Sequence, residues 1–209
     1  MTRGLLLRTP LAMLCAATVV AACGKGDKTA DSAKAADSAA AAASAAMPAP
    51  APAAPALTDP NIAAILDGAN AGDSSAGAVA ATKATNGEVR SFGRNMMRDH
   101  HALRKMGEDL VKKLGVTPVL PAGDDSQAAA TAWRDSLTAM PKGAAFDKAY
   151  IDHEVTYHQG LLQTAQAALG AAQNADLKAL IQKAAPNVQA HLDHAQKIQS
   201  TLGGAAMKP

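Results

Sequence analysis

The chain has 209 residues, of which 48% are hydrophobic and only 2% aromatic, and its formal net charge at pH 7 is +2. This nearly neutral balance lacks the basic excess of nucleic-acid-binding proteins, so nucleic acid is not an expected partner. The two cysteines both lie within the first 23 residues, which excludes a disulfide framework or a thiolate metal site in the rest of the chain. Any metal site must therefore use nitrogen and oxygen ligands.

Residues 1–22 have the layout of a secretory signal peptide, with two early arginines followed by an apolar run that ends in small residues. The run is too short to span a bilayer. The sequence Val20-Ala21-Ala22-Cys23 resembles the lipobox of bacterial lipoproteins, which implies that Cys23 is the acylated first residue of the mature protein. Gly24 after it implies sorting to the outer membrane, with the domain facing the periplasm. The alternative is a secreted protein with a free Cys23.

Residues 23–56 form a segment rich in Ala and Pro, which cannot bury a core and is expected to be a disordered tether behind the lipidated cysteine. Residues 57–203 are a normal length for one folded domain, and residues 204–209 are expected to be a disordered tail. Loss of Arg3 and Arg8 with the signal leaves basic and acidic residues in equal number, so the mature chain has no net charge.

Four long helices are predicted from hydrophobic periodicity and from capping residues at their ends. The first opens at Thr58-Asp59-Pro60, where a capping residue precedes proline at a first helical position. Asn86-Gly87 and the residues from Gly170 to Ala175 supply the two tight turns. The predicted ranges are 58–85, 88–114, 144–169 and 175 to about 203.

The first two predicted helices and the last two each form an antiparallel hairpin, because a tight turn joins them. About 28 residues separate the hairpins, and a helix of about 27 residues is roughly 40 Å long, so this segment can cross the full length of a bundle. Within it, Trp133, Leu137 and Met140 indicate a short extra helix packed on the outside. The predicted fold is all-α, a ferritin-like four-helix bundle of hairpin, long crossover and hairpin.

Each predicted long helix carries one polar side chain in the middle of its apolar stripe. These residues are Asp73, His100, His158 and His191. Because each lies at or within about one turn of its helix centre, a bundle of similar helices places them at one level. They are therefore the predicted metal ligands. Four nearby residues are candidates to orient the imidazole N–H groups: Asp99, Glu154, Tyr157 and Asp193.

Three neutral imidazoles with one carboxylate suit a single transition-metal ion, zinc, copper, iron or nickel. Two alternatives stay open. The buried polar groups can satisfy one another and fix the bundle register without metal, or they do not converge at all. A ferroxidase centre needs about four carboxylates with Glu-x-x-His on two helices, and Glu154 lies four residues before His158, not three.

No catalytic residue is assigned, because the sequence lacks a Ser-His-Asp context, a phosphate-binding glycine loop and a reactive cysteine. A binding protein is therefore favoured over an enzyme, and a redox enzyme stays open. Pro186 is expected to kink or break the last helix about one turn before His191. Six residues beside the stripes are interpreted as surface or boundary positions: Arg90, Arg94, Arg98, His101, His153 and His194. For the three arginines, contact with anionic lipid is the alternative.

The predicted helices contain several short motifs: Asp99-His100, Phe146-Asp147 with Tyr150, His158, Ala185-Pro186 and His191-Leu192. In these motifs, from about Asp59 to Leu202, the chain resembles a family of bacterial exported proteins of unknown function, often described as outer-membrane proteins. The resemblance implies a ferritin-like fold and an envelope location, but no activity. Asp73 stands where the family more often has Glu, and His153 and His194 go beyond its pattern.

These observations predict an outer-membrane lipoprotein whose helical domain binds one transition metal for storage, buffering or redox protection. The alternative is a metal-free structural or protein-interaction lipoprotein of the cell envelope. In both cases the membrane is contacted through the lipid anchor, and the protein partner is unknown.

Overall fold

The computed structural model describes residues 57–205, which form five helices and contain no strand. The helices are α1 (Asp59–Lys83), α2 (Gly87–Leu114), α3 (Ser126–Ala139), α4 (Ala144–Ala171) and α5 (Ala175–Ala205). The all-α prediction is confirmed, and the four long helices begin and end within about two residues of the predicted ranges. The predicted signal peptide, lipobox and tether, and most of the predicted tail, lie outside the described residues.

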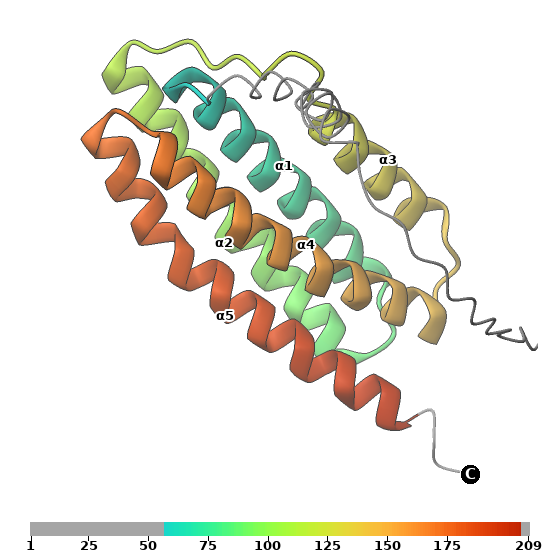
Figure 1. The fold of residues 1–209 in the computed structure, drawn as a ribbon. Coiled ribbons are helices and arrows are strands. Elements are labelled where there is room, and N and C mark those ends of the chain that lie inside the picture. The colour runs from blue at the N-terminus through green and yellow to red at the C-terminus, as the bar shows by residue number, and fades with distance from the viewer. Residues whose placement is uncertain (1–56, 206–209) are drawn as a thin grey trace, which may run out of the picture. The chain divides into compact units, whose positions relative to one another are not determined.

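Two antiparallel hairpins, α1–α2 and α4–α5, make the bundle (Figure 1). Helix α1 also packs against α4, and α2 packs against α5, so the four long helices close around one core. The segment between the hairpins starts beside the beginning of α1, where Asn61 donates a hydrogen bond to the Val119 carbonyl at 2.8 Å. Its short helix α3 then runs along the outside of α1. At the far end, Lys83 donates to the carbonyls of Leu137, Thr138 and Met140.

Each hairpin turn is held by an aspartate from the other hairpin. Asp147, in the first turn of α4, accepts hydrogen bonds from the backbone N–H and hydroxyl of Thr85 and from the N–H of Asn86. At the opposite end, Asp59 accepts from the N–H groups of Gln173 and Asn174. The spacing from Asp59 to Asn86 equals that from Asp147 to Asn174. The two hairpins therefore interlock in the same way at both ends, which fixes the relative height of all four helices.

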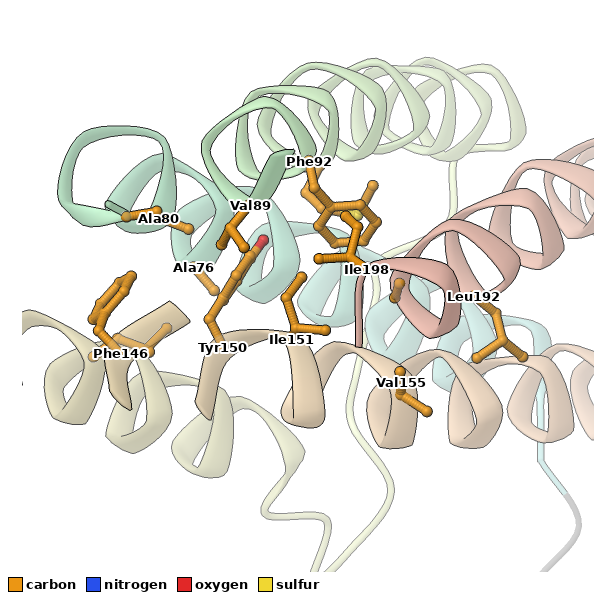
Figure 2. Packing of buried hydrophobic residues seen from close by; sticks show 14 residues of the cluster. Ala76, Ala80, Val89, Phe92, Phe146, Tyr150, Ile151, Val155, Leu192 and Ile198 are labelled. Carbon is orange, nitrogen blue, oxygen red and sulfur yellow. The ribbon is translucent and has the colours of Figure 1, made fainter. Parts of the chain in front are cut away.

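The bundle is packed most densely at the end where α1 turns into α2. The core there contains Phe92, Phe146 and Tyr150, none of which is accessible to solvent. Figure 2 shows Tyr150 of α4 pointing toward Val89 of α2, and the rings of Phe92 and Tyr150 meet edge-to-face with centroids 6.2 Å apart. A second core cluster, at the other end of the bundle, contains only Ile, Leu and Ala. The large side chains therefore lie at one end.

Close contact between α1 and α2 depends on two glycines in this dense half. A Cβ placed on Gly77 would lie 2.7 Å from the Gly93 carbonyl oxygen, and one placed on Gly93 would lie 2.8 Å from the backbone nitrogen of Ala81. Real Cβ atoms do not approach backbone so closely, so these positions require glycine. This contact sets the distance between the two helices next to Asp73 and His100.

Helix α5 continues unbroken through Pro186, so the helix does not break there, and the kink stays a prediction. Proline at this position removes one backbone N–H donor. The helix continues on either side of it, because Val188 and Ile181 remain packed in the core. Arg94 and Arg98 are exposed, as expected, whereas half-buried Arg90 donates to the carbonyls of Ala84 and Thr85. None of the helices in residues 57–205 combines the length and hydropathy needed to span a membrane.

The glycine contact between α1 and α2 gives a direct test of the packing. We expect Gly77→Ala to lower the free energy of unfolding by about 1–3 kcal/mol, because its Cβ overlaps backbone atoms of α2. Gly160→Ala, on an exposed face of α4 with no atom within 4 Å of the new Cβ, is the matched control. It should raise stability by about 0.5–1 kcal/mol through helix propensity. Urea denaturation measures both, and equal effects at the two positions would refute the close crossing.

Candidate metal centre

One buried polar side chain from each long helix lies in the middle of the bundle. Asp73 of α1 is 3% exposed, His100 of α2 and His158 of α4 are 0% exposed, and His191 of α5 is 8% exposed. The three imidazole rings are mutual neighbours, with centroid separations between 5.2 and 5.6 Å. The structure therefore brings together the four residues that the sequence singled out.

The protonated nitrogen of His100 is fixed by Asn70, one turn before Asp73 on α1. The Asn70 amide nitrogen donates to the Leu66 carbonyl at 2.7 Å, which turns its oxygen toward His100. That oxygen lies 2.9 Å from Nδ1 of His100 and accepts its proton. Because burial lowers the pKa of His100 to about 4, the ring is neutral at pH 7 and its Nε2 carries a free lone pair.

His158 is oriented by its own helix. Its Nδ1 lies 3.0 Å from the backbone carbonyl oxygen of Glu154, one turn earlier on α4, and donates to it. Burial lowers the pKa of His158 too, so the ring holds a single proton and its Nε2 is also a free lone pair. An imidazole N–H bonded to a carbonyl is the usual arrangement that orients a metal-binding histidine.

His191 has the opposite tautomer. Its Nε2 lies 3.1 Å from the Asp99 carboxylate and donates to it, which leaves Nδ1 unprotonated and buried. Burial and the neighbouring His100 lower the pKa of His191, so this ring is neutral as well. Although its partial burial acts the other way, hydrogen bonds from Arg98 and His191 lower the pKa of Asp99, which therefore stays ionised. Asp99 thus acts on His191 from a neighbouring helix, as the sequence suggested.

Two of the free nitrogen lone pairs, those of His100 and His158, lie close to one carboxylate oxygen. Oδ2 of Asp73 lies 3.1 Å from Nε2 of His100 and 3.5 Å from Nε2 of His158. One nitrogen from each of His100, His158 and His191 lies within 4.8 Å of the other two. All four atoms are buried, and none has a hydrogen-bond partner of acceptable geometry. Buried imidazole nitrogens and carboxylate oxygens grouped in this way could hold a metal ion.

Glu154 and Tyr150 extend this cluster on α4. Glu154 is 0% exposed, both of its carboxylate oxygens lack a hydrogen-bond partner, and so does the Tyr150 hydroxyl. One oxygen of Glu154 lies 3.4 Å from Nδ1 of His158, and Asp73, Glu154 and His158 form a second group with ligand atoms within 4.8 Å. Burial and the nearby Asp73 raise the pKa of Glu154 well above its usual range. Its distance from Asp73 and His158, rather than its ionisation, makes Glu154 a candidate for a further ligand.

Protonation of Asp73 would not provide every buried lone pair in this layer with a hydrogen-bond partner. Burial raises the pKa of Asp73, and a protonated Asp73 could donate to one imidazole nitrogen, for example Nε2 of His100. The lone pairs on two further rings would remain unpaired, and each buried polar atom without a partner costs about 1–3 kcal/mol. A divalent cation would instead accept all three nitrogen lone pairs, and it would balance the charges of two carboxylates.

The remaining candidates lie around this cluster. Tyr157 donates to the Ala69 carbonyl at 3.2 Å, and its ring meets that of His158 edge-on with centroids 6.0 Å apart. Asp193 is exposed and accepts from Gln189, so it does not contact the imidazoles. His101 and His194 are exposed and His153 is half-buried, as expected. His153 stacks between Trp133 of α3 and Tyr157, at centroid distances of 4.1 and 5.5 Å.

Comparison with known proteins identifies the family. The profile of a domain of unknown function, DUF4142, matches residues 42–198, which include every helix except the last turns of α5. The chain belongs to this family. Searches of curated proteins and of solved structures each found no match. Membership of DUF4142 agrees with the resemblance to a family of unknown function, and it assigns no activity to the Asp/His cluster.

Two residues of the site were not predicted from the sequence in their observed roles. Asn70 was not singled out, although it precedes Asp73 by three residues and therefore lies on the same helical face. Glu154 was expected only to orient a histidine, whereas its carboxylate is fully buried beside Asp73. Spacing gave a signal for both residues, because each lies one turn from a predicted ligand.

Proposed function

We propose that this DUF4142 domain binds one transition-metal ion between its four long helices, with Asp73, His100, His158 and His191 as ligands. The observation that carries the proposal is the hydrogen-bonding pattern of the histidines. Each N–H is directed outward, to Asn70, to a backbone carbonyl or to Asp99. Each remaining lone pair points into the buried layer and has no partner.

The donor set limits the identity of the ion. Neutral imidazole nitrogen with carboxylate oxygen suits zinc, copper, iron and nickel, and it does not suit magnesium or calcium, which prefer oxygen ligands. Storage, buffering or redox protection are functions that such a buried site supports. A metal-free role, in which the same residues only fix the register of the helices, is the competing function.

The location and the finer fold class belong to the same proposal. The hairpin, crossover, hairpin order and the convergence of polar residues from four helices support a ferritin-like bundle. The sequence Val20-Ala21-Ala22-Cys23 supports a lipid anchor on Cys23, sorted to the outer membrane, with residues 24–56 as the tether. The domain would then hold its metal in the periplasm.

Metal content of the purified protein tests the binding proposal. After reconstitution with zinc, copper, iron or nickel and desalting, the wild type should retain about one equivalent of at least one of these ions. His158→Ala should lose it, with metal affinity reduced at least about 100-fold, because a central ligand is removed. His101→Ala is the matched control, since His101 is exposed one position after His100 on the same helix. It should bind as the wild type does.

Failure of all four metals to remain bound to the folded wild type would contradict the proposal and favour the metal-free role. Equal loss of metal in His158→Ala and His101→Ala would contradict the ligand assignment. Thermal unfolding supplies an independent readout, because a ligand that binds only the folded state raises the unfolding temperature. Zinc should raise it for the wild type and for His101→Ala, but not for His158→Ala.

The anchor has its own test. Cys23→Ser removes the only sulfur that a lipobox at this position can acylate. After fractionation of a Gram-negative host, the wild type should be recovered with the outer membrane and the variant with the soluble fraction. Cys15→Ser is the control and should behave as the wild type does. Recovery of the Cys23→Ser variant in the outer membrane would refute the lipid anchor without affecting the metal site.

A further inference from the structure

One half of the bundle is hollow. A cavity of about 270 Å³ lies between α1, α2, α4 and α5, on the side of the Asp/His layer toward the turn between α4 and α5. Its walls include Leu66, Leu110, Leu180 and Ile181. An engineered cavity of roughly 150 Å³ lined by similar side chains stays dry and binds benzene. The space is therefore large enough for a molecule somewhat bigger than one aromatic ring.

The cavity follows from the uneven distribution of large side chains along the helices. Phe92, Phe146 and Tyr150 fill the opposite half, and none of the residues that line the cavity is aromatic. Small residues face it instead, among them Gly107 on α2 and Ala184 on α5. A Cβ placed on Gly107 would have no atom within 4 Å, whereas one on Gly77, in the dense half, would clash with backbone. Gly107 therefore faces open space and is not required by close packing.

Every helix that supplies a predicted metal ligand also supplies a cavity wall one turn away from it. These wall residues are Asn70, Leu103, Leu161 and Val188, each three positions from Asp73, His100, His158 or His191 in turn. The inner end of the cavity therefore lies against the Asp/His layer. Asn70, whose amide accepts the proton of His100, forms part of both the wall and the layer.

Most polar groups around the cavity have partners, and Lys112 is exposed. The Asn70 amide donates to the Leu66 carbonyl and accepts from His100. At the rim, Arg104 lies 2.8 Å from Asp67 and 3.5 Å from Glu108, so its charge is shared between two carboxylates. An anionic ligand would have to displace these partners, and a cationic one would meet Arg104. The chemistry of the walls therefore selects an uncharged, apolar molecule.

We propose that the hollow half of the bundle is a binding site for one small, uncharged, apolar molecule of about two fused aromatic rings or equivalent hydrocarbon. Such a molecule would lie against Leu66, Leu110 and Ile181, with its inner end next to the Asp/His layer. It reaches that layer without crossing the dense aromatic half. Four helices form most of its walls, and its volume limits the occupant to a small molecule. Binding does not require a metal ion.

Naphthalene, titrated calorimetrically into the purified metal-free protein, tests this site. The wild type should bind one molecule with a micromolar dissociation constant. Gly107→Leu places a side chain in the cavity and should weaken binding at least about tenfold, because the occupied volume excludes the ligand. The variant should remain folded, since leucine favours a helix over glycine and its Cβ meets no neighbour. Ala184→Leu fills the same space from α5 and should have the same effect.

Gly170→Leu is the matched control, a glycine-to-leucine change at an exposed position of α4 outside the cavity. It should bind naphthalene within about twofold of the wild type, since the cavity is unchanged. Naphthalene-2-sulfonate should bind at least about tenfold more weakly than naphthalene, because burial of its charge against apolar walls is unfavourable and Arg104 is already paired with Asp67 and Glu108. Absence of naphthalene binding to the wild type, full binding to both cavity-filling variants, or equal binding of the sulfonate would overturn the proposal. Since the protein is metal-free, none of these results depends on the metal proposal.

Discussion

Four buried polar side chains at one depth are the constraint on which the rest of this bundle depends. Removing imidazole and carboxylate groups from water is unfavourable unless each finds a partner. The protein supplies partners for the N–H side of every ring, through Asn70, the Glu154 carbonyl and Asp99. It supplies none for the lone pairs. The unsatisfied side of the layer is therefore where the proposed cation would bind.

The hairpins place this layer by interlocking at both ends. Asp147 holds the turn between α1 and α2, and Asp59 holds the turn between α4 and α5. With the helix heights fixed in this way, residues near the middle of each helix meet without any long-range pairing of their own. The two halves of the core then differ, because aromatic side chains fill one and small aliphatic ones leave the other open. The open half of the core lies directly against the buried polar layer.

Periodicity in the sequence was sufficient to predict the helices and the convergence of Asp73, His100, His158 and His191. An amphipathic helix must turn its apolar stripe inward, so a polar residue inside the stripe is carried to the core. The partners of the rings were harder to predict, because Asn70 reaches His100 across a helix pair whose spacing depends on the contact between Gly77 and Gly93. The cavity could not be predicted, since it depends on which side chains face one another across the bundle. Of the kink or break expected at Pro186, the break did not occur, because tertiary packing on both sides maintains the helix.

The tautomers of the three histidines test the central claim most directly. In two-bond proton–nitrogen correlation spectra of the metal-free protein at pH 7, His100 and His158 should carry their proton on Nδ1, and His191 on Nε2. All three rings should be neutral, because burial lowers their pKa values. Addition of one equivalent of zinc should shift only the unprotonated nitrogen of each ring. A doubly protonated ring in the layer, or a proton on Nδ1 of His191, would show that the lone pairs do not converge and would contradict the account.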